Sequence, residues 1–313
     1  MINSTKIKVI GIGGSGSNAV SRMMKCKIQG IDLIALNTDV QDLAKTKAHK
    51  KIRIGQETTK GLGAGMNPEL GRKAAEESIG EIDQVIKGSD MIFITCGLGG
   101  GTGSGAAPVV AELAKKQGIL TIAVVTKPFS FEGNQRQSIA EKALDNLKSR
   151  VDTLLIIPND KVLSLVDKET SVLSAFWLCD EVLREAVQGI SDLIIFPGII
   201  NVDFSHLKAI MKNSGPALFG IGYGRGENRV EEAVNSAINS PLLDFSIQGA
   251  KGVLFNVSGG KDLSLDEINS IANIITKSVN SRAKIIFGAV NDKRLTDGEI
   301  KLTVIATGFD HGR

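Results

Sequence analysis

A chain of 313 residues is long for one average domain and sufficient for two, each with its own hydrophobic core. Its 42% hydrophobic and 23% charged residues are typical of a soluble protein, and a net charge of +3, from 37 basic and 34 acidic side chains, carries no nucleic-acid-binding signature. No signal-peptide-like stretch opens the chain and no run of about 18 apolar residues occurs, so we expect neither export nor membrane insertion.

The numbers and positions of cysteine, histidine and glycine further limit the kinds of protein that this chain can be. Cys26, Cys96 and Cys179 are odd in number and far apart, which argues against a disulfide framework or a zinc site and favours a reducing cytoplasm. The three histidines are scattered as well, so no metal site built by the protein is predicted. The 35 glycines among 313 residues are a larger share than the average usage of about 7%. Many backbone positions must therefore need a positive φ or a close approach, as loops that hold a ligand do.

The N-terminal half alternates short β-rich runs with helical segments. The predicted strands are residues 7–12, 33–36, 91–94, 119–125 and 154–157. The predicted helices are residues 68–87, 106–117 and 134–148. Alternation of this kind predicts parallel strands with crossover helices, so we expect a doubly wound, Rossmann-like α/β domain over residues 1–170.

A long central helix is predicted next, at residues 171–196. Apolar residues recur along two of its sides, and a helix that is apolar on two sides is buried on both, as it would be between two domains. The two sets are Val172, Phe176, Cys179, Leu183, Ala186 and Ile190, and Leu173, Trp177, Val182 and Val187.

The remaining residues, 197–313, have a different pattern and predict a smaller α+β domain. The predicted elements are helices at 201–211 and 227–238 and strands at 252–257, 283–290 and 301–307. The last segment alternates apolar and polar residues in its first part, as a half-buried antiparallel strand does.

Residues 13–18, GGSGSN, join the first predicted strand to a helix. Amides at a helix start point outward, the helix dipole favours negative charge, and glycine lets a phosphate approach the backbone. Gly11, Gly13 and Gly16 also satisfy G-x-G-x-x-G, which is a weak signal alone because glycine at such a turn can serve only packing.

Two more glycine segments make the signal specific. Residues 97–105, GLGGGTGSG, offer consecutive amides for a di- or triphosphate, with the Thr102 and Ser104 hydroxyls as added donors. They follow a predicted strand, at the end where α/β sheets bind ligands. Residues 61–68, GLGAGMNP, lead into a helix with proline in its first turn. Three such loops at one sheet edge predict a site for an extended phosphate chain.

Longer stretches of sequence, spread between Lys6 and Phe309, are also typical of one known protein family. They include VIGIGGSGSNAV, ALNTDVQDL, GLGAGMNPELGRKAAEES, GLGGGTGSGAAPVVAELAK and DEVLREAVQGISDLI. On these stretches the chain resembles the tubulin/FtsZ family of GTPases, above all its bacterial cell division members. The resemblance implies GTP or GDP as ligand, Mg²⁺ held through the phosphates and water, and head-to-tail filaments for the division ring. It also implies a cytoplasmic location at midcell, with other division proteins and membrane adaptors as partners where a C-terminal tail exists.

The resemblance assigns roles to the residues that would hold the phosphates and the ribose. Glu132 and Arg136 would contact ribose and phosphate, although a Glu and an Arg four residues apart otherwise indicate a solvated helix pair. The phosphate cradle is implied at Gly13, Gly14, Ser15, Gly99, Gly100, Gly101, Thr102, Gly103 and Ser104, with Ala64 and Gly65 near the γ-phosphate.

The base would be read by Asn18, Asn159 and Asp180, with Phe176 as a stacking face. Phe176 and Asp180 are four residues apart on a helix, so both lie on one side of it. A carboxylate can accept the N1 and N2 hydrogens of guanine, which adenine does not offer in that arrangement. For Phe176, packing in the core is an equal alternative.

In this family, hydrolysis is completed at a subunit junction, where a loop of the neighbour's C-terminal domain positions the attacking water. The resemblance places this loop at residues 198–206, with Asn201 and Asp203 in it and His206 where a second aspartate is usual. Phosphoryl transfer depends on positioning and electrostatics, so the missing carboxylate should slow turnover without abolishing binding. Alternatively, His206 caps or packs at a helix start and Asp203 suffices.

Two other functions stay open. G-x-G-x-x-G, with Asp39 about 20 residues beyond it, would suit an NAD-dependent oxidoreductase, but this leaves two glycine loops unexplained. A filament protein that binds GTP without hydrolysing it is disfavoured only by Asp203.

Overall fold

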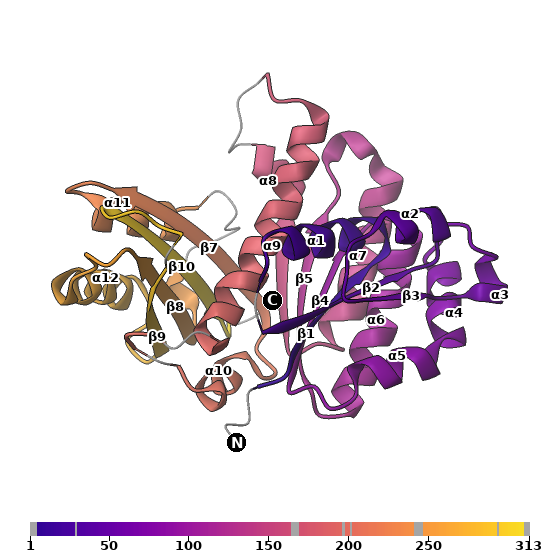
Figure 1. Cartoon of the computed structure of the whole chain (residues 1–313), viewed down its shortest axis with the longest axis horizontal. Helices are drawn as coiled ribbons and strands as arrows, with labels where there is room; N and C mark the ends of the chain where they lie inside the picture. Colours follow the sequence, from indigo (N-terminus) through magenta and orange to yellow (C-terminus); the bar gives the residue numbers. More distant parts are fainter. Residues whose placement is uncertain are drawn as a thin grey trace. The chain divides into compact units, whose positions relative to one another are not determined.

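The computed structural model describes residues 5–28, 30–163, 169–195, 198–200, 202–240, 247–292 and 294–309. The chain divides into two compact units, unit 1 (Met1–Gln188) and unit 2 (Gly189–Arg313). Unit 1 runs from indigo to pink in Figure 1 and unit 2 continues to yellow. The boundary lies within helix α9 (Val172–Ile195), so this helix contributes residues to both units.

Unit 1 contains a parallel sheet whose strands, among the described residues, are ordered β3–β2–β1–β4–β5–β6. All five predicted strands are confirmed, and the short edge strand β3 was not predicted. β4 is buried along almost its whole length, as expected for a parallel strand covered on both faces. The strands are β1 (Ile7–Ile12), β2 (Ile31–Asn37), β3 (Lys50–Arg53), β4 (Met91–Gly97), β5 (Leu120–Lys127) and β6 (Thr153–Pro158).

The helices of unit 1 flank this sheet. Residues of α4, α5, α6 and α7 share a hydrophobic cluster with Ile10 and Ile12 of β1. The predicted helix at 134–148 is confirmed, whereas 68–87 is two helices separated at Ser78. The helices are α1 (Gly13–Lys25), α2 (Val40–Lys45), α3 (Gln56–Thr59), α4 (Pro68–Glu77), α5 (Ile79–Ile86), α6 (Gly101–Lys116), α7 (Asn134–Lys148) and α8 (Asn159–Val162), with a 3₁₀ turn η1 (Ser130–Glu132).

The glycine segments differ from the sequence-based prediction, because two of them form helical turns instead of loops. α1 begins at Gly13 and α6 at Gly101, whereas the sequence predicted a helix only from residue 106. α6 packs closely on α4: a Cβ added at Gly105 would lie 2.0 Å from the carbonyl oxygen of Pro68. Glycine in this segment therefore permits helix packing as well as ligand approach.

The N-terminal part of α9 contradicts the prediction that both of its apolar sides are buried. Val172, Leu173, Phe176 and Trp177 are 62%, 84%, 40% and 50% exposed. From Cys179 onward the apolar residues of both sets are buried. The periodic pattern was correct for the helix, but burial also requires a neighbouring element, which only the tertiary structure supplies.

Unit 2 contains a mixed sheet ordered β7–β10–β8–β9 among the described residues. β10 (Glu299–Thr307) is antiparallel to β7 (Gly215–Arg225) and β8 (Gly252–Gly259), which confirms the antiparallel prediction for the last strand. β9 (Lys284–Asn291) is parallel to β8. The sheet is accompanied by helices α10 (Phe204–Met211), α11 (Arg229–Ile238) and α12 (Leu265–Ser278) and a 3₁₀ turn η3 (Ile247–Gly249).

Two elements of unit 2 were not predicted. β7 contains several glycines, which disfavour strands, but a Cβ at Gly222 would lie 2.0 Å from the carbonyl oxygen of Ala233 in α11, so the strand needs glycine there. α12 has a local signal in the capping box formed by Ser264 and Glu267. No helix in the described part of the chain is both long and apolar enough to cross a membrane.

Candidate functional site

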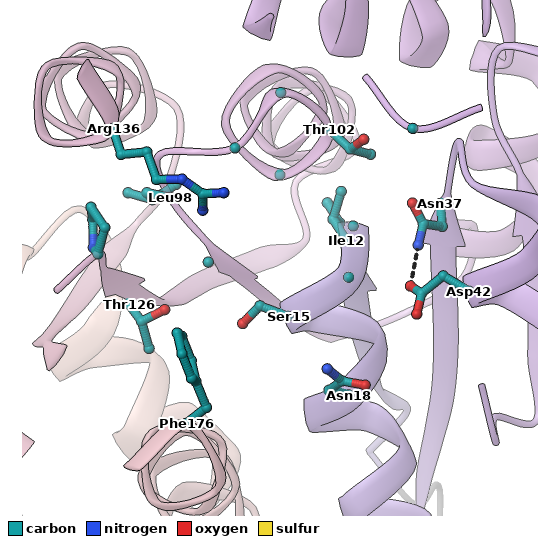
Figure 2. A pocket seen from close by; sticks show the side chains of 18 of the residues that line it. Ile12, Ser15, Asn18, Asn37, Asp42, Leu98, Thr102, Thr126, Arg136 and Phe176 are labelled. Carbon is teal, nitrogen blue, oxygen red and sulfur yellow. Dashed lines mark hydrogen bonds between the residues drawn. The ribbon is translucent and has the colours of Figure 1, made fainter. Parts of the chain in front are cut away.

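One cavity of about 660 Å³ lies at the carboxyl ends of the parallel strands in unit 1 (Figure 2). Ile12, Asn37, Gly97 and Thr126 line it from the ends of β1, β2, β4 and β5. The chain runs from β1 outward to β2 and β3, and from β4 outward to β5 and β6, so the strand order reverses between β1 and β4. Open α/β sheets bind ligands at such a switch point, and the volume lies within the roughly 300–1,000 Å³ typical of small-molecule sites.

Two helix N-termini line this cavity, because α1 begins at Gly13 and α6 at Gly101. In neither helix does an N-cap side chain bond the amides of the first turn, and neither first turn contains an acidic residue. Gly13 has a φ of +71°, a conformation that side-chain-bearing residues rarely adopt. Amides without a side-chain cap at a positive helix terminus favour an anion such as phosphate.

The third glycine segment is joined directly to the second. The amide of Gly101 donates a 2.6 Å hydrogen bond to the carbonyl oxygen of Gly65. Ala64 and Gly65 line the same cavity as α1 and α6. The three glycine segments predicted from the sequence to share a sheet edge therefore do so.

Most of the residues that sequence reasoning assigned to nucleotide binding line this one cavity. They are Gly13, Gly14, Ser15, Asn18, Ala64, Gly65, Gly100, Gly101, Thr102, Gly103, Glu132, Arg136, Asn159, Phe176 and Asp180.

Gly99 and Ser104 do not line the cavity. The Ser104 hydroxyl is buried and accepts a 2.9 Å hydrogen bond from the Gly99 amide, so it connects the two ends of the glycine segment. The Thr102 hydroxyl does line the cavity, but it already lies 2.8 Å from the Thr38 hydroxyl. That the Thr102 and Ser104 hydroxyls donate to a ligand stays a prediction, because a hydroxyl that accepts one hydrogen bond still has its own proton to donate.

Glu132 and Arg136 form an ion pair on the cavity wall. Nη1 of Arg136 lies 3.0 Å from Oε2 of Glu132, and Oε1 of Glu132 accepts a 2.9 Å hydrogen bond from the Phe129 amide. Figure 2 shows the Arg136 guanidinium directed into the cavity. Glu132 belongs to the turn η1 and not to α7, so the pair is not a solvated pair on one helix.

The four residues that were predicted to hold the base line the same cavity. Asn159 is buried, and its Oδ1 has no hydrogen-bond partner among the described residues. Phe176 and Phe129 form a T-shaped pair, with ring centroids 5.1 Å apart at 90°, and Phe176 remains 40% exposed. An unsatisfied buried oxygen and a half-covered ring are suited to a bound aromatic ligand.

Asp180 supplies a buried carboxylate to the same region. Burial raises its pKa to about 6, opposed by the charge and hydrogen bond of Arg22. Nε of Arg22 lies 3.1 Å from Oδ2 of Asp180. At neutral pH this carboxylate is largely ionised and can accept hydrogen bonds from a ligand.

Sequence reasoning missed Asn37 and Asp42, and it considered Asp39 only for a different function. All three line the cavity where β2 ends. Asn37 donates from Nδ2 to Oδ2 of Asp42 at 2.6 Å, drawn dashed in Figure 2. Burial, and then the charge of Asp39, raise the pKa of Asp42. Polar residues directly after a predicted strand were the available signal, because strand carboxyl ends meet at one edge.

The loop that begins α10 belongs to unit 2. Asn201 lies outside the described residues. Asp203 is the N-cap of α10: its Oδ1 accepts a 2.7 Å hydrogen bond from the Ser205 amide, which lowers the pKa of the carboxyl group. His206 is exposed in the first turn, and only its backbone amide donates to the carbonyl of Asp203, at 3.0 Å. The helix cap is therefore Asp203, and the alternative in which the side chain of His206 caps the helix is wrong.

Comparisons with known proteins agree with this geometry. The GTPase domain of the tubulin/FtsZ family matches residues 6–167, and the C-terminal domain of the FtsZ family matches residues 215–310. An empty FtsZ dimer from M. jannaschii is 48% identical, with a TM-score of 0.94 over 98% of this chain and 89% of that one. The chain belongs to the tubulin/FtsZ family.

More distant members of the tubulin/FtsZ family share the fold. GDP-bound monomeric CetZ1 from Haloferax volcanii is 25% identical, with a TM-score of 0.83 over 98% of this chain and 95% of that one. CetZ2 from the same organism, at 22% identity and a TM-score of 0.81 over 99% and 95% of the two chains, shows the fold alone. The predicted fold class and family are thus confirmed.

Membership in the tubulin/FtsZ family makes this chain a GTP-binding cytoskeletal filament protein, with residues 6–167 as its GTPase domain. It excludes the NAD-dependent oxidoreductase. The structure gives Asp39 another role, since its Oδ1 accepts hydrogen bonds from the amides of Gln41 and Asp42 as the N-cap of α2.

Proposed function

We propose that the chain binds GTP in the cavity of unit 1, assembles head to tail with copies of itself, and hydrolyses GTP slowly at the subunit junction. The observation that carries this proposal is the joint lining of one cavity by two uncapped helix N-termini and a buried carboxylate. The helix ends suit phosphates, and the carboxylate suits the edge of guanine. Assembly is supported by the family, and one of its solved members is a dimer.

Within this proposal the two ends of the cavity have separate tasks. The amides near Gly13 and Gly101 hold the phosphates, and Arg136, paired with Glu132, contacts ribose and phosphate. Asp180 accepts from N1 and N2 of guanine, and Asn159 and Asn18 complete the reading of its edge. Phe176 covers the ring. Adenine has no N1 and N2 hydrogens to donate to this buried carboxylate, which would keep only its bond from Arg22, and this favours guanine.

Mg²⁺ would accompany the triphosphate. Asp39 and Asp42 line the phosphate side of the cavity, and carboxylate oxygens are donors that this ion prefers, so the residues present fit it. We infer that they accept hydrogen bonds from its water ligands. When bound, the ion neutralises charge on the phosphates during transfer.

Hydrolysis would use the loop that begins α10 of a neighbouring subunit. Asp203 would orient the attacking water, and Asn201, which lies outside the described residues, is the second candidate that the family resemblance assigns to this step. His206 stands where a second carboxylate is usual in the family, and an exposed imidazole offers less negative charge to polarise water. Turnover should therefore be slow, and the filaments long-lived.

In the cell we expect the filaments to form part of the division ring at midcell, in the cytoplasm. Other division proteins and membrane adaptors are the partners that the family suggests. Localisation of a fluorescent fusion in dividing cells tests this expectation.

Phosphate release and sedimentation test the catalytic proposal. His206→Asp should raise GTP turnover in assembled protein by about tenfold, because a positioned carboxylate aids activation of the water. Ala209→Asp is the matched control, since it adds the same charge at another exposed position of α10, away from Asp203, and should leave turnover unchanged. If the native chain and His206→Asp turn over GTP at the same rate, the missing carboxylate does not limit hydrolysis.

A second candidate, a filament that binds GTP without hydrolysing it, is favoured by one observation. The carboxylate of Asp203 is already engaged as a helix cap. Light scattering that rises with GTP, in protein that releases no phosphate above background, would establish this candidate in place of the slow GTPase.

A further inference from the structure

Arg22 and Trp177 lie behind Asp180, outside the cavity itself. Arg22 belongs to α1, whereas Trp177 and Asp180 lie on α9. The Arg22 guanidinium carbon is 5.1 Å from the centroid of the Trp177 ring, and Nε of the same residue is 3.1 Å from Oδ2 of Asp180. Of the three, only Asp180 lines the cavity. The indole, the guanidinium and the carboxylate thus form a chain of contacts that ends at the cavity.

The ion pair matters because Asp180 is buried. Its side chain is 12% exposed, and that of Arg22 is 21% exposed, so solvent screens the pair only in part. Arg22 is the group that favours the ionised form of Asp180, whereas burial and the neighbouring charge of Glu181 oppose it. Without Arg22 the carboxyl group would protonate more readily and would lose a partner that restricts its orientation.

Trp177 explains how Arg22 is held in place. A half-exposed tryptophan on a helix does not serve the core, and its ring is instead covered by a cation. Tryptophan is the side chain whose face best attracts a guanidinium. Arginine is long and flexible, so a second contact on its planar head restricts the orientations in which Nε reaches Asp180.

We propose that Trp177 is a positioning residue for recognition of the base: it holds Arg22 against Asp180 and thereby keeps the carboxylate that reads guanine oriented and ionised. This rests on the proposed binding of guanine nucleotide in the same cavity. Trp177 acts through two side chains and does not touch the ligand.

The first test compares GDP with inosine diphosphate, which lacks the 2-amino group of guanine. Trp177→Leu should weaken GDP binding by about threefold, the size of an exposed cation–π contact, and should reduce the preference for GDP over inosine diphosphate by a similar factor. Trp177→Phe keeps an aromatic face and should restore most of that preference. Val172→Ala, an exposed apolar residue earlier on the same helix, is the control and should behave like the native chain.

The second test is the pH profile of GDP binding. Both Trp177→Leu and Arg22→Gln should move the acid limb of the profile to higher pH, because each weakens the contact that keeps Asp180 ionised. Two other charged groups lie near this site: Glu181 acts on Asp180, and Glu132 acts on the neighbouring Cys179. Both are unchanged in these variants. In the double variant, the acid limb should shift little further than in Arg22→Gln alone, since the indole acts through Arg22.

Trp177 is the only tryptophan of the chain, so its fluorescence reports on the contact directly. GDP should change the emission of the native protein and change it less in Arg22→Gln. Unaltered base preference and an unaltered acid limb in Trp177→Leu would overturn the positioning role while leaving GDP binding intact. Failure of the native chain to bind GDP would instead overturn the proposed function, and the inference with it.

Discussion

The cavity of unit 1 takes in the N-termini of two helices, which offer backbone amides, whereas the loop that begins α10 in unit 2 offers single side chains. At the cavity, helices α1 and α6 supply amides from their first turns, and no side chain caps them. At the loop, Asp203 supplies one carboxylate that already caps a helix, and His206 is exposed beside it. In the proposed function, phosphate binding therefore follows from how the chain folds, while hydrolysis depends on the identity of one or two residues.

The cavity and the α10 loop also differ in which substitutions they tolerate. At Gly101 and Gly103 a Cβ would lie 2.6 and 2.7 Å from backbone carbonyl oxygens, so substitutions there affect folding as well as binding. A substitution at residue 206 alters an exposed side chain and leaves the helix intact. Under the proposed function we therefore expect substitutions at residue 206 to change the rate of hydrolysis without loss of nucleotide binding.

The largest expected effect is at the loop. Asp203→Asn should lower GTP turnover by about 100-fold, because the amide has no negative charge with which to activate water. Asparagine caps a helix as well as aspartate does, so stability and GDP affinity should not change.

Asp203→Ala separates the two tasks of this residue. It should lose turnover to the same extent and also lower the thermal midpoint, since alanine cannot cap α10. Phosphate release and thermal unfolding measure both effects. Substantial turnover in Asp203→Asn would mean that this carboxylate is only structural.

In the cavity, Gly101→Ala should weaken GDP binding by about 30-fold, because the displaced segment no longer directs its neighbouring amides at the phosphates, and destabilise the fold by about 1–3 kcal/mol. Its Cβ would lie 2.6 Å from the carbonyl oxygen of Ala64, so the segment must shift. Gly80→Ala is the matched control, because a Cβ there has nothing within 4 Å. Calorimetry and thermal unfolding that find Gly101→Ala equal to Gly80→Ala would contradict a backbone-built site.

Binding should also depend on pH through Asp180, whose pKa is about 6. Guanine binds the ionised form and so lowers this pKa in the complex; affinity is then constant above about pH 7 and roughly tenfold lower at pH 5. Asp180→Asn is the control, since GDP's terminal phosphate titrates equally in both proteins but the variant has no carboxyl group. Parallel pH profiles for the two proteins would argue against reading of the base by Asp180.

The smallest effect concerns the charge beside the phosphates. Asp42→Asn should strengthen GDP binding without Mg²⁺ by about fivefold, because one negative charge near the anion is removed. With Mg²⁺ the gain should be smaller. Asp145→Asn makes the same change on the exposed surface of α7 and should have no effect. A loss of affinity in Asp42→Asn would mean that Asp42 supports the ligand by another route.

Many features of the fold and of the cavity were predictable from the sequence, because they depend on local sequence patterns. The strand, glycine segment and helix order placed Gly13 and Gly101 at one sheet edge, and helical spacing predicted 134–148. The family resemblance supplied Asn159 and Asp180, which no spacing argument could have joined to the glycines. β7 was missed because its glycines satisfy contacts with α11 that no local rule contains.

The sequence by itself determined the parts of this protein that depend on neighbours along the chain: the parallel α/β order, the glycine segments and the one loop position held by His206. Only the tertiary structure decided that the glycines begin helices, that Trp177 is exposed, and that Arg22 pairs with Asp180 across 158 positions. The physical reason is that burial and ion pairing depend on which distant segments meet. Helix and strand periodicity specifies which face of an element is apolar, but not what covers it.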